Sequence, residues 1–399
     1  MRFLNKTTVL MYGLTAASVA RAATYSITDI GTLGGASSFG LDVNTNRQVS
    51  GNSNITAAAA TAEGATGTTL RAYSYTGGTL TNPGALPGST TNRFARGYAI
   101  NDGGVVVGEF NNDSSRAFVY NPATGSMAGL IRLAGGSDSG TAVDINNGGG
   151  IVGVSSNGTT SRATKWTLTA GTYAPADLGS IDGLTTTPAR ANAVNSNGSA
   201  AGLSRNAAGT SQATLWSGGG VINLGSLGDG TRFSSANGIN DANSVVGYSY
   251  TGQTVGQLIG TTSTTVIQRA FLAQGGTNAE LPPVNLYSPT NTGTTTNYHS
   301  VANDINSAGL VVGNSQRISG SPAVATLWMD GVPIDLNTLI PAGSGWFLTS
   351  AEGINSAGDI TGYGTIGGAT HAFLLTVPEP GSLAIIGLSG ITILGRKRR

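Results

Sequence analysis

The sequence predicts an all-β protein, and more specifically a seven-bladed β-propeller, from three observations. The first is composition, because the 399 residues include 62 Gly, only 10% are charged and 39% are hydrophobic. Many turns between short apolar strands produce this composition, whereas a helical protein would contain more Glu, Lys, Leu and Arg. The second is a motif that recurs seven times, and the third is the way in which the two ends of the repeat array complement each other.

The recurring motif is an aliphatic residue followed by Asn, with a Gly seven residues after that Asn. Its seven occurrences are Val43-Asn44 with Gly51, Ile100-Asn101 with Gly108, Ile145-Asn146 with Gly153, Val194-Asn195 with Gly202, Ile239-Asn240 with Gly247, Ile305-Asn306 with Gly313, and Ile354-Asn355 with Gly362. Successive Asn residues lie 45 to 66 positions apart, close to the ~40–50 residues of a four-stranded propeller blade. The motif therefore predicts seven similar β units.

Each unit divides into four short strands. The first ends at the aliphatic-Asn pair and is followed by hairpin residues such as 101–104, in which Asn, Asp and Gly favour a tight turn. The second is a run such as Val311–Gly313, whose Gly allows neighbouring backbones to approach. The fourth is clearest in Asp177–Gly179, Asn223–Gly225 and Asp335–Asn337.

The order of the strands at the two ends of the array predicts closure. The seventh unit has strands at Ala351–Asn355, Asp359–Tyr363 and His371–Thr376 but lacks a fourth, whereas Tyr25–Gly35 matches the fourth-strand sequence of 223–228. If this early segment completes the last unit, the ring closes and exposes no strand edge. The alternative is an open β-solenoid of seven repeats, which would require terminal caps.

The third strand carries the most recognisable triplet of the repeat. It reads His371-Ala372-Phe373 in the last unit, and Arg116-Ala117-Phe118 and Arg269-Ala270-Phe271 in two others. From Ala23 to about Thr376 the chain resembles the extracellular HAF-repeat family, which takes its name from such a triplet. In three units Thr replaces the aromatic residue, namely at Thr164, Thr214 and Thr326. The resemblance implies an extracellular repeat protein and no particular activity.

The first 22 residues have the features of a secretory signal peptide. A positively charged start, Met1–Lys6, precedes a short apolar run, and Ala20-Arg21-Ala22 provides small residues before a cleavage point. A buried N-terminal helix is the alternative interpretation. We expect signal peptidase to act after Ala22.

The last segment, 377–399, is predicted to be a sorting signal. Pro378-Glu379-Pro380 precedes an apolar stretch, 383–394, that is shorter than the ~20 residues of an ordinary spanning helix. The basic residues Arg396, Lys397, Arg398 and Arg399 end the chain and should stay cytoplasmic. This order resembles the PEP-CTERM signal of Gram-negative bacteria. It implies a transient inner-membrane anchor through a short transmembrane helix, processing by an exosortase that recognises Pro378, Glu379 and Pro380, and transfer to the cell surface or extracellular matrix.

Charge and cysteine content exclude several functional classes. Seven of the 20 basic residues lie in the two terminal signals, which leaves 13 against the 19 acidic residues of the chain. A mildly acidic body does not suit nucleic-acid binding. The sequence contains no Cys, so disulfides, thiolate metal sites and a cysteine nucleophile are excluded. We expect contact with the membrane only through the C-terminal signal. We also expect the repeat region, 23–376, to form one β domain.

The sequence indicates no catalytic residue, cofactor or metal. Its two histidines are His299, which follows a long insertion, and His371, which takes a strand position held by Arg in four other units. No Gly-x-Ser-x-Gly motif accompanies them. The segments Asp42–Asn44, Asp144–Asn146 and Asp304–Asn306 have a weak similarity to calcium loops, but the following ligand positions are not acidic. Turn formation explains these segments better.

Variable loops indicate where a ligand would bind. The second-to-third and fourth-to-first strand connections of a propeller open on one face, and here these connections vary in length, at 52–70, 84–95, 251–267 and 284–298. The candidate binding residues on that face are Arg93, Asp138, Arg232, His299 and Trp346.

Location and composition together predict an exported, non-enzymatic protein of the cell surface or matrix, with a structural or binding role. Its expected partner is an exopolysaccharide or a surface protein. One alternative is a glycan lyase or hydrolase on the same scaffold, although glycoside hydrolysis needs two positioned carboxylates. The other is a calcium-stabilised adhesive module.

Overall fold

The computed structural model describes residues 25–63, 69–84, 94–111, 115–135, 139–228, 230–254, 266–284, 299–316 and 322–378. These residues form antiparallel β-sheets and almost no helix, which confirms the predicted all-β class. We number the repeats in chain order by their first strands.

Repeats 2 to 6 are five separate four-stranded sheets, each formed by four consecutive strands. Repeat 2 contains β6 (Phe94–Ile100), β7 (Val106–Asn111), β8 (Ser115–Asn121) and β9 (Ser126–Gly129). Repeat 3 contains β10 (Gly140–Ile145), β11 (Ile151–Ser156), β12 (Ser161–Thr169) and β13 (Thr172–Asp177). Repeat 4 contains β14 (Ala189–Val194), β15 (Ala200–Arg205), β16 (Ser211–Ser217) and β17 (Gly220–Gly225). Repeat 5 contains β18 (Ser234–Ile239), β19 (Val245–Thr254), β20 (Val266–Gln274) and β21 (Thr277–Leu281). Repeat 6 contains β22 (His299–Ile305), β23 (Val311–Gln316), β24 (Val324–Met329) and β25 (Val332–Asp335).

Repeats 1 and 7 come from opposite ends of the chain and are linked. Repeat 1 contains β2 (Gly34–Val43), β3 (Val49–Ile55), β4 (Leu70–Thr76) and β5 (Thr79–Thr81). Repeat 7 contains β26 (Trp346–Ile354), β27 (Ile360–Ile366) and β28 (Ala369–Thr376). Its fourth strand is β1 (Ser26–Gly31), which pairs antiparallel with β28. One parallel bridge, between Ser37 and Thr370, joins the two repeats into an eight-stranded sheet.

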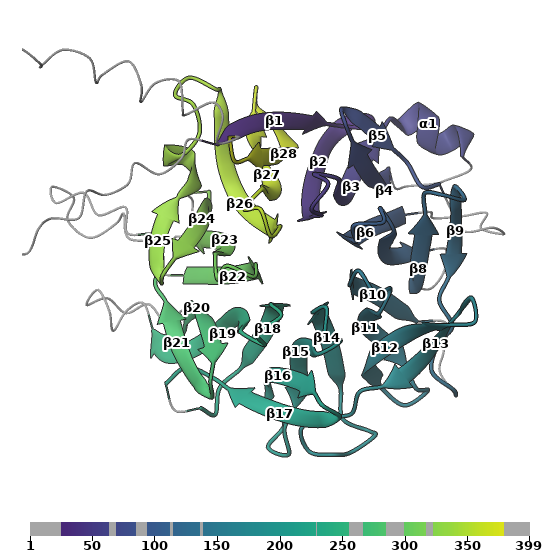
Figure 1. The fold of residues 1–399 in the computed structure, drawn as a ribbon, viewed down its shortest axis with the longest axis vertical. Helices are drawn as coiled ribbons and strands as arrows, with labels where there is room; N and C mark the ends of the chain where they lie inside the picture. Colours follow the sequence, from purple (N-terminus) through teal and green to yellow (C-terminus); the bar gives the residue numbers. More distant parts are fainter. Residues whose placement is uncertain are drawn as a thin grey trace, which may run out of the picture.

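Figure 1 shows the sheets arranged around a common centre, with the first strand of each repeat, from β2 to β26, nearest to it. The later strands of each repeat lie progressively further out. This order follows from the pairing of consecutive strands within each sheet.

The repeated Asn has two structural roles. Its Oδ1 accepts backbone N–H groups of its own turn, as in Asn306, which accepts from Ala308 and Leu310 at 3.0 Å each. Its Nδ2 donates to the backbone carbonyl of the Asn in the following repeat, as from Asn195 to Asn240 at 3.0 Å. The other donor-acceptor pairs are Asn44 to Asn101, Asn101 to Asn146, Asn146 to Asn195, Asn240 to Asn306, Asn306 to Asn355 and Asn355 to Asn44. Turn formation and contact between repeats therefore depend on the same side chain.

Neighbouring repeats pack through the bulky third-strand residues. Trp328 of β24 is fully buried against Val246 and Ala270 of repeat 5. Its indole Nε1 donates to the carbonyl of Pro282 at 2.7 Å, so the polar edge of the ring is also satisfied. Trp166 and Trp216 bond in the same way to Ile131 and Gly179 of the preceding repeats. Apolar packing and an indole hydrogen bond thus hold adjacent sheets together.

Two segments differ from the expected pattern. A short helix, α1 (Ala57–Ala62), occupies part of the predicted variable loop 52–70, and Thr56 caps it by accepting from the Ala59 N–H at 3.1 Å. In repeat 6 the predicted fourth strand 335–337 is instead mostly a 3₁₀ turn, η1 (Leu336–Thr338). The Asp335 side chain accepts from the Asn337 N–H at 2.8 Å, and this local bond ends the strand at Asp335.

Candidate functional site

A β-bulge recurs at one position in all seven first strands. In β10, Ala142 pairs with Gly153 and Asp144 pairs with Val152, so Val143 is an extra residue without an opposite number on β11. The same register shift occurs in β2, β6, β14, β18, β22 and β26. The seven extra residues are Leu41, Tyr98, Val143, Asn192, Asn237, Asn303 and Glu352. Bulges redirect side chains and are common next to binding sites.

The repeated Gly is the residue opposite each bulge. An added Cβ at Gly202 would overlap the carbonyl oxygen of Arg190 and lie 2.9 Å from the Cα of Ala191. The other six repeated glycines would meet the carbonyl at the equivalent position of their own first strand in the same way. Because these glycines lie within strands, glycine is required there by the lack of space for a Cβ, as expected from the close backbone approach.

The seven extra residues line a cavity of about 400 Å³, which we call the central cavity. In six of the seven repeats the residue that follows the bulge also lines this cavity, and it is Asp in repeats 1, 3 and 6, as Asp42, Asp144 and Asp304. A neighbouring cavity of about 380 Å³ is lined by the seven aliphatic-Asn pairs. Because every repeat contributes to both cavities, they lie at the centre around which the sheets are arranged.

Three consecutive amides form one part of the central-cavity wall. Asn192, Asn237 and Asn303 each donate from Nδ2 to a backbone carbonyl of the next repeat, at 2.7, 2.9 and 2.9 Å. The acceptors are Ala236, Ala302 and Ala351. Each amide is therefore held in a fixed orientation by the neighbouring sheet.

Glu352 follows these amides and is the one carboxylate at a bulge position. Its Oε2 accepts from Asn303 Nδ2 at 3.1 Å, and its Oε1 accepts from the Ser350 hydroxyl at 2.6 Å. Burial raises the pKa of Glu352, and the Ser350 hydrogen bond opposes this shift. The carboxyl group is thus desolvated but hydrogen-bonded.

Tyr98 supplies a phenol to the opposite part of the wall. Its hydroxyl donates to Glu109 Oε1 at 3.0 Å, and the same oxygen accepts from Arg96 Nη1 at 2.8 Å. The other carboxylate oxygen accepts from the Thr141 hydroxyl of repeat 3 at 3.1 Å. Burial, and then the charge of Glu109, raise the pKa of Tyr98. The network fixes the phenol ring at the cavity.

The three aspartates connect adjacent repeats. In Asp144, Oδ1 accepts from the Ile145 N–H and Oδ2 accepts from the Val194 N–H of repeat 4, both at 2.7 Å. Asp42 and Asp304 make the equivalent pairs of bonds, to Val43 and Ile100 and to Ile305 and Ile354. These contacts assign the aspartates a role in joining strands, which accounts for the segments that resembled calcium loops.

Burial determines the protonation behaviour of these aspartates. It raises the pKa of Asp42 to about 8, with a further contribution from the charge of Asp144, while the two backbone N–H groups oppose the shift. Burial also raises the pKa of Asp144 to about 6 and that of Asp304. Desolvation therefore outweighs hydrogen bonding in all three.

Metal coordination has no evident site in the part of the chain that the structure describes. Within those ranges, no group of three or more His, Asp or Glu side chains could hold a metal ion. The chemistry available in the central cavity is hydrogen bonding by amides, one phenol and carboxyl groups.

The sequence-predicted binding residues fall elsewhere. Arg93 and Asp138 lie outside the described residues. Arg232 is exposed, and its guanidinium lies over Gly252. His299 begins β22, its Nδ1 accepts from the Gln268 N–H at 3.1 Å, and burial followed by the charge of Arg269 lowers its pKa. Trp346 packs edge-on against Phe373, with ring centroids 6.1 Å apart. These three described candidates are not among the residues that line the central cavity.

The predicted processing residues lie almost entirely outside the described residues. This applies to Ala20 and Ala22 and to Glu379, Pro380, Arg396, Lys397, Arg398 and Arg399, while Pro378 lies at the edge of the last described range. Sequence reasoning missed the bulge residues. The signal available was their fixed place, three residues before each repeated Asn, and not a shared residue type.

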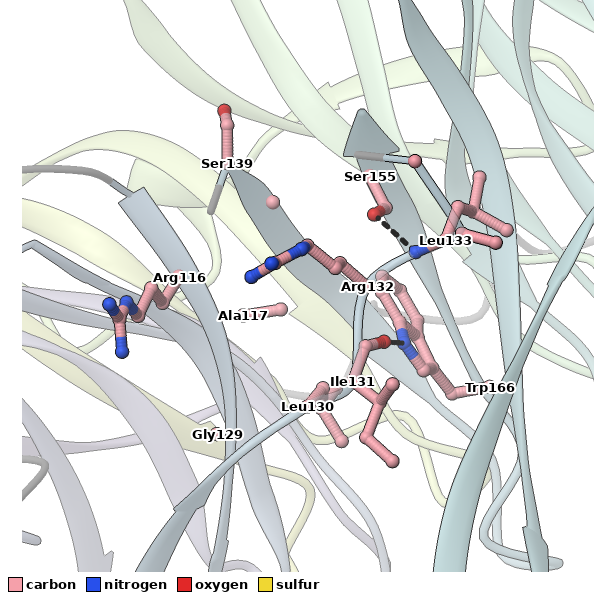
Figure 2. A pocket seen from close by; sticks show the side chains of 13 residues that line it. Arg116, Ala117, Gly129, Leu130, Ile131, Arg132, Leu133, Ser139, Ser155 and Trp166 are labelled. Atoms are coloured by element: carbon pink, nitrogen blue, oxygen red, sulfur yellow. Dashed lines mark hydrogen bonds between the residues drawn. The ribbon is translucent and has the colours of Figure 1, made fainter. Parts of the chain in front are cut away.

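A larger cavity of about 830 Å³ lies between repeats 2 and 3. Figure 2 shows the side chains of Arg116 and Arg132 on its walls, together with Trp166 and Ser139. This cavity was not predicted from the sequence.

Comparison with known proteins gives little for the repeat region. No curated protein matches the sequence. One similar solved structure is that of a Mycobacterium tuberculosis puromycin-hydrolyzing peptidase, with 12% identity over 67% of this chain and a TM-score of 0.42. The chain spans 40% of that protein. A likeness at this level says nothing about the activity of the present chain.

The C-terminal segment does match a family model. Within the described residues, no helix combines the length and apolar character that crossing a bilayer requires, and the apolar stretch 383–394 lies outside them. Residues 376–399 match the PEP-CTERM protein-sorting motif, as the sequence predicted. This motif indicates an exported protein of Gram-negative-type bacteria that is processed by an exosortase and sorted to the cell surface.

Proposed function

We propose that the protein is a closed seven-bladed β-propeller that acts at the cell surface as a non-enzymatic binding or structural component. Each repeat would be one blade, and β1 would complete the seventh. The chain of Asn hydrogen bonds supports closure, because each Nδ2 bonds to the next repeat and that of Asn355 bonds back to Asn44 at 3.0 Å. A closed ring removes exposed strand edges, which suits a protein exported from the cell.

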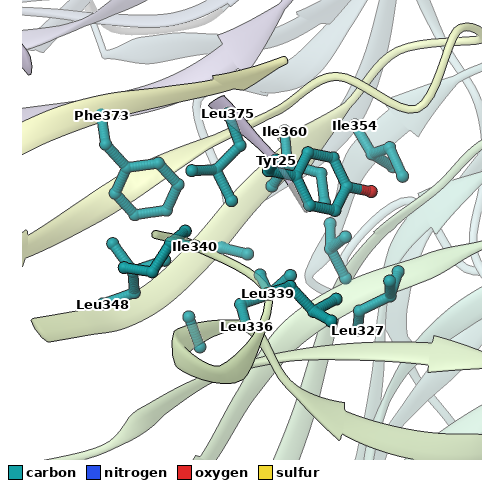
Figure 3. Packing of buried hydrophobic residues seen from close by; sticks show 13 residues of the cluster. Tyr25, Leu327, Leu336, Leu339, Ile340, Leu348, Ile354, Ile360, Phe373 and Leu375 are labelled. Carbon is teal, nitrogen blue, oxygen red and sulfur yellow. The ribbon is translucent and has the colours of Figure 1, made fainter. Parts of the chain in front are cut away.

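Packing around Tyr25 also supports closure. Tyr25 immediately precedes β1, and Figure 3 shows its ring among Leu336, Leu339 and Ile340 at the end of repeat 6 and side chains of repeat 7. Its N–H donates to the Leu339 carbonyl at 2.8 Å. Burial, with a smaller effect of the charge of Asp359, raises the pKa of Tyr25 to about 12. The N-terminal strand is thus fixed to two repeats from the far end of the chain.

The proposed protein has three parts. Residues 1–22 act as a signal peptide, 23–376 as the propeller, and 377–399 as the sorting signal, with the terminal basic residues held in the cytoplasm until processing. The PEP-CTERM match supports the last part. The mature propeller then functions at the surface or in the extracellular matrix, where its partner is an exopolysaccharide or a surface protein.

The central cavity carries the functional proposal, because its wall suits an uncharged ligand rich in hydroxyl groups. The described lining residues include amides, a phenol and carboxyl groups but neither Lys nor Arg. An anion would find no cationic partner on this wall, whereas sugar hydroxyls can both donate to and accept from amide, phenol and carboxyl groups. A volume of about 400 Å³ is large enough for a sugar unit. We therefore propose a neutral saccharide as its ligand.

The test is binding of neutral oligosaccharides to the exported protein purified from cells. Asn237→Leu would place an apolar group in the central cavity and remove the bond to Ala302, so we expect it to abolish binding. Asn197→Leu is the matched control, because Asn197 Nδ2 makes a similar bond between repeats, to the Asp241 carbonyl at 3.0 Å, on the exposed turn side. Equal binding by the two variants would refute the central cavity as the site.

Product analysis of each bound polymer distinguishes binding from catalysis. Intact polymer after incubation supports the binding role. Released oligosaccharides that disappear with Glu352→Gln would instead establish a glycan-active enzyme. Surface fractionation of cells that carry Glu379→Ala tests the destination separately, since loss of sorting should leave the protein associated with the inner membrane.

A further inference from the structure

The cavity between repeats 2 and 3 differs from the central cavity in its charge. Its walls include the exposed side chains of Arg116, from β8, and Arg132, from the segment after β9. Figure 2 shows the Arg132 guanidinium pointing toward the side of the view where Arg116 and Ser139 lie, and away from the Trp166 ring. Its volume is about 830 Å³, which is within the range of ligand sites. Two cations in one cavity are notable in a chain whose repeat region has more acidic than basic residues.

The segment that carries Arg132 is held in place by both repeats. The Leu130 N–H donates to the Ala117 carbonyl of repeat 2 at 2.8 Å. The Ile131 carbonyl accepts from Trp166 Nε1 at 2.6 Å, and the Leu133 N–H donates to the Ser155 hydroxyl at 3.2 Å, both in repeat 3. Arg132 lies between two of these anchored residues. Its backbone is therefore positioned before any ligand arrives, which lowers the entropy cost of binding.

Comparison of the repeats shows how the fourth strand of repeat 2 differs from the others. In three other repeats the basic residue of the third strand pairs with an acid of the fourth strand: Arg162 with Asp177, Arg269 with Glu280 and His371 with Asp29. In the strand pairing, each of these acids lies opposite the residue two positions after the basic one. In repeat 2 the basic residue is Arg116, so the corresponding third-strand residue is Phe118, and the fourth-strand residue opposite it is Gly129. The fourth strand of repeat 2 thus supplies no side chain at the place where its counterparts supply a carboxylate.

We propose that this cavity binds a carboxylate-bearing sugar, with the ligand carboxylate taking the place that a fourth-strand acid occupies in the other repeats. A guanidinium group presents five N–H donors in a planar fork that matches a carboxylate. Each arginine can therefore keep a contact within the protein and still donate to a ligand. Leu130 and the half-exposed Ile131, 53% exposed, provide apolar surface for the face of a sugar ring. The wall contains two cations and suits an acidic saccharide, unlike that of the central cavity.

This inference rests on the proposed function only in taking the ligand to be a saccharide. The two sites are separable, because neutral and acidic saccharides should respond to different substitutions. If acidic saccharides fail to bind while neutral ones still depend on Asn237, the inference is wrong and the proposed function stands. If neither class binds, both are wrong.

The test uses the full exported protein and three probes: an oligouronate, its methyl ester and a sulfated oligosaccharide of equal length. We expect the oligouronate to bind and the uncharged ester to bind about tenfold or more weakly, since charge-assisted hydrogen bonds are lost. Tighter binding of the sulfated probe would identify sulfate and not carboxylate as the ligand group and would overturn the proposal as stated.

Two substitutions assign the site. Arg132→Gln should weaken oligouronate binding about tenfold or more, whereas Arg205→Gln, which removes one charge from an exposed residue outside the cavity, should leave it unchanged. Gly129→Asp restores the acid of the other repeats, and we expect it to abolish oligouronate binding without lowering the melting temperature, because Gly129 is exposed and extended. Unchanged oligouronate binding by Arg132→Gln and Gly129→Asp would refute the proposal.

Discussion

The side-chain Nδ2 of Asn355 donates to the backbone carbonyl of Asn44, 3.0 Å away, although 311 residues separate them in the chain. The same bond joins every other pair of successive repeats, so repeats 7 and 1 meet as internal neighbours do. Arg47 and Asp359 add an ion pair at 3.1 Å beside it. Contacts of the last repeat with the first are therefore equivalent in kind to contacts within the array.

This equivalence predicts that Asn355→Ala and Asn195→Ala destabilise the protein to the same degree. Both side chains are buried and bond to the next repeat. Each substitution removes the bond to the next repeat and leaves a buried N–H of its own turn, that of Asp359 or Ser199, without its partner, which costs about 1–3 kcal/mol. Chemical unfolding of the two variants measures the cost, with the exposed Asn197→Ala as a control. A much smaller effect of Asn355→Ala would mean that the contact between repeats 7 and 1 does not form.

The raised pKa values predict a protein that is less stable at higher pH. Aspartates ionise near pH 4 in the unfolded chain, whereas burial raises the pKa of Asp42 to about 8 and that of Asp144 to about 6. Between these values the folded state holds protons that the unfolded state has released, so raising the pH favours unfolding. The free energy of unfolding should fall from about pH 4 to about pH 8, with Asp42 responsible for the last part.

Substitution assigns that pH dependence. Asp42→Asn should flatten the slope between pH 6 and 8, and the exposed Asp330→Asn should not. His299 has the opposite effect, because burial lowers its pKa. Its contribution to the free energy of unfolding therefore increases as the pH rises to about 6.5. Melting temperatures measured between pH 6 and 8 test this assignment. If the decrease in stability with pH is the same in Asp42→Asn as in the unchanged protein, the assignment is wrong.

The bulges predict that the repeated glycines do not tolerate a methyl group. Gly202→Ala would force Cβ onto the Arg190 carbonyl, and overpacking of this kind costs about 1–3 kcal/mol. Gly220→Ala is the comparison, because the nearest atom to an added Cβ there is 3.5 Å away. Thermal unfolding of both variants provides the measurement. Equal stabilities would show that the first and second strands can separate at the bulge without cost.

Chelation should leave the melting temperature unchanged. Both carboxylate oxygens of Asp42, Asp144 and Asp304 accept backbone N–H groups, so these residues stabilise the fold without an ion. Thermal melts with and without a calcium chelator test this expectation. A clear drop in the chelated sample, reversed by added calcium, would favour the adhesive-module alternative.

Features shared by all repeats could be predicted from the sequence. The Asn turns and the opposed glycines recur at fixed spacing, and each has one physical cause that acts seven times. The pairing of β1 with β28 was also predictable, because residues 29–34 resemble the fourth-strand sequence 223–228.

The candidate sites were less predictable because they depend on what the repeats do not share. The bulge position holds Leu41, Tyr98, Val143, an Asn three times and Glu352, so a search for similarity passes over it. The bulge arises from the register between two strands, which a single strand does not reveal. The cavity beside Arg132 depends on Gly129 and on hydrogen bonds to a neighbouring repeat, and neither forms a motif.

The most direct test of the proposed closed ring is a disulfide between β1 and β28. Ser26 lies opposite Thr376 in this pair, and the chain contains no Cys, so Ser26→Cys with Thr376→Cys gives one possible bridge. Opposed strand residues lie close enough for a disulfide with little adjustment. We predict that the exported double variant forms an intramolecular disulfide and that its melting temperature rises when oxidised. Free thiols or only intermolecular links in the folded protein would contradict closure by the N-terminal strand.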